Sequence, residues 1–323
     1  VNGGESWAHL PRPARSSIRT LRISQSYGFD STLLAMPQDG GLFASRNGGD
    51  AWSELLGTDI EITDALATGV DGTPLIVAVV QDSSVLRMIG ANGEWEEAKG
   101  LDKAMGGGVV WASTNDASIL VVDGSGRVFS SDDKATSFRP IGEIPIGLDG
   151  KRGPATSISS FVAPDGTEVI HASTWHGGVV TSRDGGESWR PSNGGLTKSK
   201  QADDLNAPHF SRIAPADDHL FLAGFDGLFR SDDRGQHWFQ LETLAVDLPT
   251  ALTVSKPTGK REELFITTLD AGNYVGKNRG SEWQTLNLGI KNTHQWSIRS
   301  SALDGDTSLV LSAANKSIYR LVN

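Results

Sequence analysis

The sequence contains no cysteine, which excludes disulfide scaffolds, thiolate metal sites and cysteine nucleophiles. It contains no run that approaches the roughly 18 apolar residues of a membrane-spanning helix. The opening stretch, VNGGESWAHLPRPARS, is polar and interrupted by glycine and proline, so it lacks the apolar core of a secretory signal peptide. We therefore expect a globular chain with no membrane insertion and no signal peptide within this sequence.

Positive charge is also scarce. The net charge is −10, which argues against a long surface that follows phosphates, so no nucleic acid partner is expected. The seven histidines show no metal-binding spacing, and there is no glycine-rich phosphate loop and no G-x-S-x-G turn. We expect neither a metal nor a cofactor.

Glycine and tryptophan are abundant, with 38 and 9 residues respectively. Segments with the periodicity of a long helix are hard to find, whereas short apolar runs separated by turn residues are frequent. This combination predicts many short strands joined by tight turns.

One motif of eight residues recurs along the chain. The copy SRDGGESW, which ends at Trp189, has the pattern S-x-D-x-G-x-x-W, and SRNGGDAW, SDDRGQHW and GKNRGSEW keep its spacing. SDDKATSF and ANGEW are worn copies, and the opening NGGESW carries only the later part of the motif. The motif residues are Asn2, Gly4, Trp7, Ser45, Asn47, Gly49, Trp52, Ser131, Asp133, Phe138, Ser182, Asp184, Gly186, Trp189, Ser231, Asp233, Gly235, Trp238, Asn278, Gly280 and Trp283.

The spacing of these copies predicts a closed arrangement. Their terminal aromatic residues lie at 7, 52, 95, 138, 189, 238 and 283, at intervals of 43 to 51 residues. The step from 283 through the end of the chain to 7 is 47 residues, which falls in the same range. The two ends of the chain are therefore expected to be neighbours.

Each interval contains four strand-like runs, which is typical of a propeller blade. We predict an all-β, seven-bladed β-propeller of four-stranded blades over residues 1–323, closed by the N-terminal strand (1–10), which completes the last blade. The predicted blades are 17–57, 60–99, 106–142, 155–193, 208–243, 248–288 and 294–323.

The motif resembles the Asp box of the sialidase-like (BNR) repeat proteins, and the resemblance covers nearly the whole chain. The resemblance implies a β-propeller but no single activity, because such boxes occur in sialidases, xyloglucan-cleaving glycosidases, sortilin-type receptors and photosystem II assembly factors. A single ring is similar in plan to the photosystem II assembly factors and other non-catalytic members. The box residues are interpreted as turn-forming and core-packing residues.

The resemblance implies that a ligand meets the face opposite the boxes, around a central channel. Aromatic rings beside short polar groups suit a sugar or a protein hot spot, and packing under the loops is the third interpretation. Arginines on the expected innermost strands would contact anions. The candidate binding residues are Trp175, His176, Phe225, Asp226, His294, Trp296, Arg22, Arg212 and Arg299.

An enzyme is the alternative. A sialidase has six blades and a tyrosine nucleophile, whereas this count gives seven and the chain has three tyrosines in loops or third strands. A glycan-cleaving hydrolase or lyase would need paired carboxylates, for which Asp64, Asp226 and Asp270 are the weak candidates.

The favoured hypothesis is a non-catalytic recognition scaffold for a glycan or protein ligand, as a monomer or as a module of a larger assembly. The stretch ISQSYGFDSTLLAM resembles a phrase of bacterial exported repeat proteins, S-P-x-Y-x-x-D-x-T-L-x-A. That resemblance predicts a periplasmic or secreted protein.

Overall fold

The regular structure of the chain is almost entirely β. The computed structural model describes residues 6–70, 73–81, 84–90, 92–101, 108–113, 118–145, 154–174, 178–196, 210–216, 219–224, 227–242, 249–255, 262–291, 293, 295–302, 308–314 and 317–322. Contacts divide the chain into two compact units, residues 1–60 with 240–323, and residues 61–239. Within the described ranges, no helix is both long enough and apolar enough to cross a membrane.

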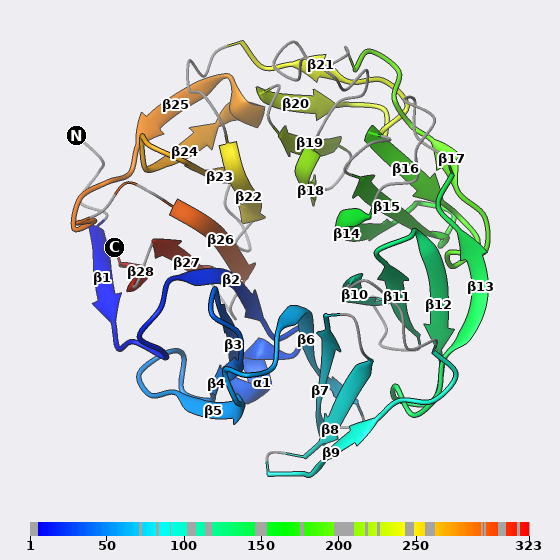
Figure 1. The fold of residues 1–323 in the computed structure, drawn as a ribbon. Helices are drawn as coiled ribbons and strands as arrows, with labels where there is room; N and C mark the ends of the chain where they lie inside the picture. The colour runs from blue at the N-terminus through cyan, green and yellow to red at the C-terminus, as the bar shows by residue number, and fades with distance from the viewer. Residues whose placement is uncertain are drawn as a thin grey trace. The chain divides into compact units, whose positions relative to one another are not determined.

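The first unit contains three four-stranded sheets and two short helical turns (Figure 1). Two of the sheets run in chain order, and the third combines the N-terminal strand with the last three strands. The elements are β2 (Ile18–Ile23), α1 (Tyr27–Asp30), β3 (Leu33–Pro37), β4 (Leu42–Ser45), β5 (Ser53–Leu56), β22 (Pro249–Ser255), β23 (Glu263–Thr268), β24 (Asn273–Lys277), η1 (Asn278–Gly280), β25 (Glu282–Thr285), β26 (Gln295–Ala302), β27 (Ser308–Ala314), β28 (Ser317–Val322) and β1 (Ser6–Leu10).

The second unit contains four four-stranded sheets, each in chain order. The boundary between the units falls within β21. The strands are β6 (Ile62–Val70), β7 (Thr73–Val80), β8 (Val85–Ile89), β9 (Trp95–Glu97), β10 (Gly108–Ala112), β11 (Ile119–Asp123), β12 (Arg127–Ser131), β13 (Arg139–Glu143), β14 (Ala155–Val162), β15 (Glu168–Thr174), β16 (Gly178–Ser182), β17 (Arg190–Pro191), β18 (Phe210–Ala216), β19 (His219–Gly224), β20 (Gly227–Ser231) and β21 (Phe239–Gln240).

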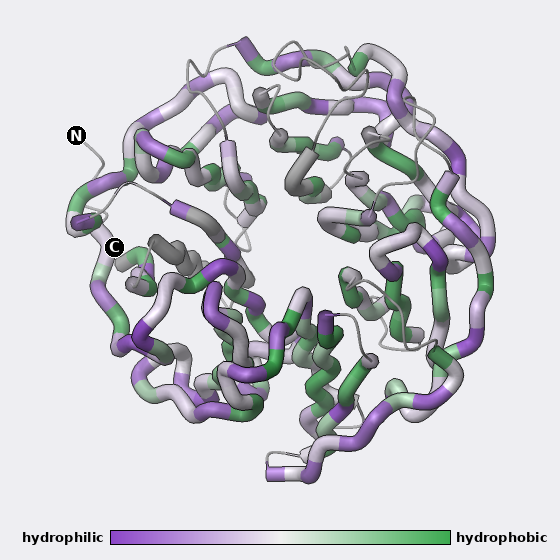
Figure 2. Tube along the Cα trace, in the orientation of Figure 1, coloured by the Kyte–Doolittle hydropathy of each residue, from purple (hydrophilic) through white to green (hydrophobic). Residues whose placement is uncertain are grey.

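The second strands of several sheets are fully buried. All five residues of β3 are buried, as are all five of β11 and all six of β19. Figure 2 shows hydrophobic stretches along β7 and β11. A strand that is covered on both faces has a nearly continuous apolar sequence. The fourth strands β5, β13 and β25, in contrast, are largely exposed. These patterns follow from sheets that pack face to face.

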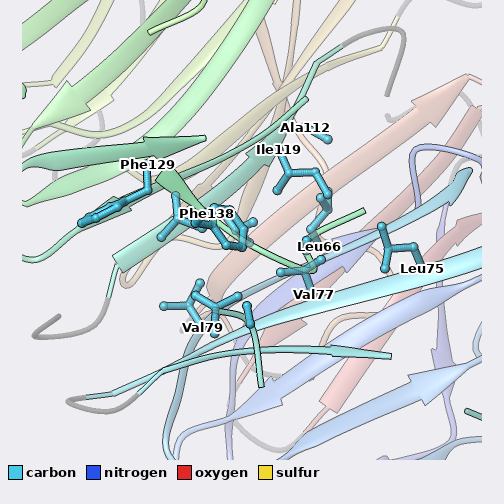
Figure 3. Packing of buried hydrophobic residues seen from close by; sticks show 13 residues of the cluster. Leu66, Leu75, Val77, Val79, Ala112, Ile119, Phe129 and Phe138 are labelled. Carbon is cyan, nitrogen blue, oxygen red and sulfur yellow. The ribbon is translucent and has the colours of Figure 1, made fainter. Parts of the chain in front are cut away.

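The core lies between neighbouring sheets. In the second unit, side chains of the sheet β6–β9 meet side chains of the sheet β10–β13 in one buried cluster (Figure 3). Phe138, the aromatic residue of a worn Asp box, is 4% exposed in this cluster. The box aromatic therefore joins its own sheet to the sheet before it.

The prediction of a single closed ring of seven blades is corrected by this architecture. The structure is an all-β fold of four-stranded propeller blades in two compact units, with three blades in one and four in the other. The repeat spacing could not predict this division. A turn motif indicates where each hairpin lies. The grouping of sheets into units depends instead on contacts between residues far apart in the sequence.

The N-terminal strand completes the last sheet, as the sequence predicts. β1 pairs antiparallel with β28, from Ser6 opposite Val322 to Leu10 opposite Ile318. Trp7 and Leu10 are 4% and 3% exposed. They lie on opposite faces of β1 and pack in different core clusters, so a shift by one residue would turn each towards the wrong neighbouring sheet.

Candidate functional site

The Asp boxes share one local hydrogen-bond network. In the copy at 182–189, the Ser182 hydroxyl donates to Asp184 Oδ1 at 2.8 Å and accepts the Gly186 amide at 2.9 Å. Asp184 Oδ1 also accepts the Ser188 amide at 2.9 Å. The same three bonds occur in the copies Ser45–Asn47–Gly49–Ala51, Ser131–Asp133–Ala135–Ser137 and Ser231–Asp233–Gly235–His237. The motif is therefore a self-contained turn.

These networks hold the box carboxylates in their charged form. Burial alone would raise the pKa values of Asp133, Asp184 and Asp233, but hydrogen bonds from the turn lower all three overall. A carboxylate committed to its own turn in this way is poorly suited to donate a proton to a substrate.

Several of the box tryptophans are anchored by a hydrogen bond from the indole nitrogen. The indole Nε1 of Trp189 donates to the Gly186 carbonyl at 2.9 Å, and that of Trp283 donates to the Gly280 carbonyl at 2.8 Å. Trp7 donates to the Leu286 carbonyl at 2.6 Å. Asn2 and Gly4 of the opening copy lie outside the described residues.

A second repeated element joins consecutive sheets, and it was missed in the sequence. We call Gly100, Gly195 and Gly289 the strap glycines. Each follows the fourth strand of one sheet, has a φ between +80° and +89°, and lies against the backbone carbonyl of the next box aromatic. The residue before each strap glycine accepts the amide of that aromatic, in the pairs Phe138 to Lys99, Trp238 to Gly194 and Trp7 to Leu288.

The strap glycines have a sequence signal. Each is followed by a partly buried aliphatic residue, Leu101, Leu196 or Ile290, which packs against the core between the joined sheets. Each also lies five or six residues after a box aromatic. A glycine followed by leucine or isoleucine at this spacing would have revealed the element.

Hydroxyl groups tie neighbouring first strands together. Thr250 Oγ1 of β22 donates to the Gln295 carbonyl of β26 at 2.8 Å, and Thr253 Oγ1 lies 2.8 Å from Ser300 Oγ between the same two strands. In the second unit, Thr63 Oγ1 of β6 donates to the Gly108 carbonyl of β10 at 3.1 Å. The first strands are therefore joined by side chains rather than by a backbone ladder.

Asp64, a candidate catalytic residue, takes part in the same linkage. Its side chain is on β6 and is 2% exposed. Oδ1 accepts the Ala65 amide at 2.9 Å, and Oδ2 accepts the Val110 amide of β10 at 3.2 Å. The carboxylate thus bridges two sheets and satisfies backbone donors at their junction.

This geometry makes Asp64 a stability residue. Asp64→Ala is expected to lower the free energy of unfolding by about 2 to 4 kcal/mol, because it leaves buried amides without their charged acceptor. Asp64→Asn keeps one carbonyl acceptor and should cost less. Urea unfolding of the three proteins checks the order, and equal midpoints for wild type and Asp64→Ala would contradict it.

The other candidate carboxylates form no described pair with Asp64. Asp226 lies outside the described residues, and Asp270 is an exposed turn residue between β23 and β24 of the first unit, whereas Asp64 belongs to the second. Across the described parts of the chain, no three acidic or histidine side chains form a group that could hold a metal ion.

Of the predicted ligand residues, Trp175, His176, Phe225 and His294 lie outside the described residues, as does Asp226. Two more belong to strands of which the structure describes the backbone, Arg212 in β18 and Trp296 in β26.

Arg22 and Arg299 are the two candidates whose surroundings are described. Arg22 is on β2 and Arg299 is on β26, and both side chains are half-buried. These strands are the first strands of their sheets and are in contact (Figure 1), where the Leu21 amide donates to Ser297 Oγ at 3.3 Å. Arg299 Nη1 donates to the Ile298 carbonyl at 2.7 Å. The structure therefore places two guanidinium groups on neighbouring edge strands of the first unit.

No known family model and no curated protein matches the chain. Solved structures do resemble it. YCF48 from Cyanidioschyzon merolae matches with a TM-score of 0.68 and 14% identity over 98% of both chains. A YCF48 bound to D1 peptide matches with a TM-score of 0.70 and 14% identity, over 100% of this chain and 98% of that one.

The WD40 β-propeller domain of Doa1 matches with a TM-score of 0.65 and 9% identity, over 98% of this chain and 97% of that domain. At these identities the likeness concerns the fold and leaves the activity open. Together with the sheet topology, it shows that the chain is an all-β propeller built from four-stranded blades.

Proposed function

We propose that this protein is a non-catalytic recognition scaffold that binds an extended acidic segment of a partner protein. The observation that carries the proposal is the placement of Arg22 and Arg299 on neighbouring first strands of the first unit. Guanidinium groups recognise carboxylates with paired, charge-assisted hydrogen bonds, so two of them on adjacent edge strands suit a segment with more than one acidic residue.

Two further observations support a binding role. One of the structures with the same fold has a peptide bound. In addition, the Asp64 carboxylate accepts hydrogen bonds from two backbone amides at a sheet junction, which is a structural role. A glycan ligand is the other class that the sequence suggests, but it rests on Trp175, Phe225 and Trp296, whose side chains the structure does not describe.

The test starts from a random dodecapeptide phage library panned against the protein. Acidic peptides are expected to be enriched, and an enriched peptide should bind the Arg22→Ala/Arg299→Ala variant at least tenfold more weakly. Loss of a charge-assisted hydrogen bond costs about 1.5 to 3 kcal/mol, and about 1.4 kcal/mol corresponds to tenfold in Kd. Fluorescence anisotropy with the labelled peptide measures the change.

The matched control is Arg139→Ala/Arg190→Ala, which removes the same charge from the exposed fourth strands β13 and β17. It should bind like the wild type. Enrichment without acidic bias, or equal weakening in both double variants, would refute the proposed site. Thermal melts of both variants exclude unfolding as the cause.

A further inference from the structure

A buried histidine lies at the junction of two sheets in the second unit. His171 of β15 is fully buried, and its ring stacks on Phe161 of β14 with centroids 5.6 Å apart and an interplanar angle of 16°. Nδ1 lies 2.8 Å from the Thr181 hydroxyl of β16. Within the described part of the chain, Nε2 has no hydrogen-bond partner.

The other side of this imidazole faces the Asp box of the next sheet. A methyl group on Gly235 would lie 3.1 Å from His171 Cε1, so the box turn packs directly against the ring. In the segment after β17, the Ser192 hydroxyl donates to the Gly235 carbonyl, and the Ser192 backbone carbonyl accepts the Trp238 indole Nε1 at 2.8 Å. The imidazole therefore lies beneath the contact that joins β14–β17 to β18–β21.

Two arginines lie near the imidazole. Arg234 of the box lies over the Phe161 ring at 5.9 Å, on the ring that stacks with His171. Arg183, which follows β16, bonds to Asp165 at 3.3 Å and disfavours a second positive charge at His171. Across the described side chains of these two sheets, the other charged and titratable groups are Glu168, Asp184, Glu187, Arg190, His219, Arg230, Asp232, Asp233 and His237.

We propose that His171 makes this junction an acid-sensitive contact, which opens when the imidazole takes up a proton. The proton would add a cation to a buried ring near Arg183 and Arg234, where Nε2 has no described acceptor. Opening lets water reach the ring, and it breaks the strap contacts from Ser192 and Gly194 to the neighbouring box.

The expected change in the opening equilibrium follows from the difference between the pKa of His171 in the closed junction and its pKa in water. Burial, with a smaller contribution from Arg183, lowers the pKa of His171 from 6.5 to about 4 in the closed junction. The closed form is thus favoured fully above pH 6.5, and this advantage is lost as the pH falls towards 4. With these two values, the opening equilibrium increases about 20-fold between pH 7 and pH 5.

Hydrogen exchange measures this opening in the intact protein. The Trp238 amide, which donates to the Gly194 carbonyl at 2.6 Å, reports the junction. The Phe138 amide, which donates to the Lys99 carbonyl at 2.8 Å in the equivalent strap of another junction, is the internal control. Between pH 7 and pH 5 the protection factor of Trp238 should fall about 20-fold more than that of Phe138. An equal change at both amides would overturn the proposal.

Two variants test whether His171 causes the loss of protection at Trp238. His171→Phe should abolish the excess loss at Trp238, and His171→Asn serves the same purpose if the phenylalanine variant does not fold. His237→Ser should keep the loss, because serine occupies the equivalent position in two other boxes as Ser137 and Ser188. A loss that persists without His171, or disappears in His237→Ser, would show that His171 is not the sensor.

Discussion

Deletion of residues 1–10 is expected to lower the free energy of unfolding by about 5 kcal/mol or more and to promote aggregation. The deletion removes Trp7 and Leu10 from the core, and burial losses of this kind cost about 2 to 5 kcal/mol each. It also removes the strand that pairs with β28 along five residues. β28 would then present an unpaired edge to other molecules.

Urea unfolding and light scattering on the truncated protein measure both effects. A synthetic peptide that spans residues 1–10, added in trans, should restore part of the stability, whereas a peptide with Trp7→Ala should restore less. If the truncated protein unfolds at the wild-type midpoint and remains monodisperse, then β1 does not hold the last sheet together.

Gly195→Ala is the second change with a large expected effect, a loss of at least about 3 kcal/mol. Gly195 has a φ of +81°, and an added methyl group would overlap the carbonyl oxygen of Trp238. The strap would have to move away from the next sheet. That movement would break the bond from the Trp238 amide to Gly194 and loosen Leu196 from the core.

Gly166→Ala is the matched control. Gly166 has almost the same φ, +82°, but an added methyl group would meet no atom within 4 Å. It should cost about 1 to 2 kcal/mol, the cost of a left-handed backbone alone. Denaturant unfolding of the two variants separates backbone strain from close approach, and equal losses would mean that the strap does not hold the sheets together.

The Asp boxes were predictable because their chemistry is local. The bonds from Ser182 and Asp184 reach residues at most four positions away, so a short pattern describes the whole turn. The pairing of β1 with β28 was predictable because the interval between box aromatics remains regular only if the chain ends meet.

The links between sheets were not predictable in the same way. Thr63 reaches Gly108, 45 residues along the chain, and Asp64 reaches Val110, 46 residues along. A single threonine or aspartate carries no sign of such a partner. This is why Asp64 was predicted as a weak catalytic candidate, when its carboxylate bridges two strands. The division into two units has the same origin, since it depends on contacts between distant residues.

The last sheet also has a consequence for the order of folding during synthesis. His9 and Ser317 are neighbours in this sheet but 308 residues apart in sequence. At about 5 to 20 residues per second, a ribosome needs roughly 15 to 60 s between them. β1 must wait unpaired through that time, while the four sheets of residues 61–239 emerge in order. The sheet that joins the two ends is therefore the last to form, and the nascent chain is most open to chaperones before it does.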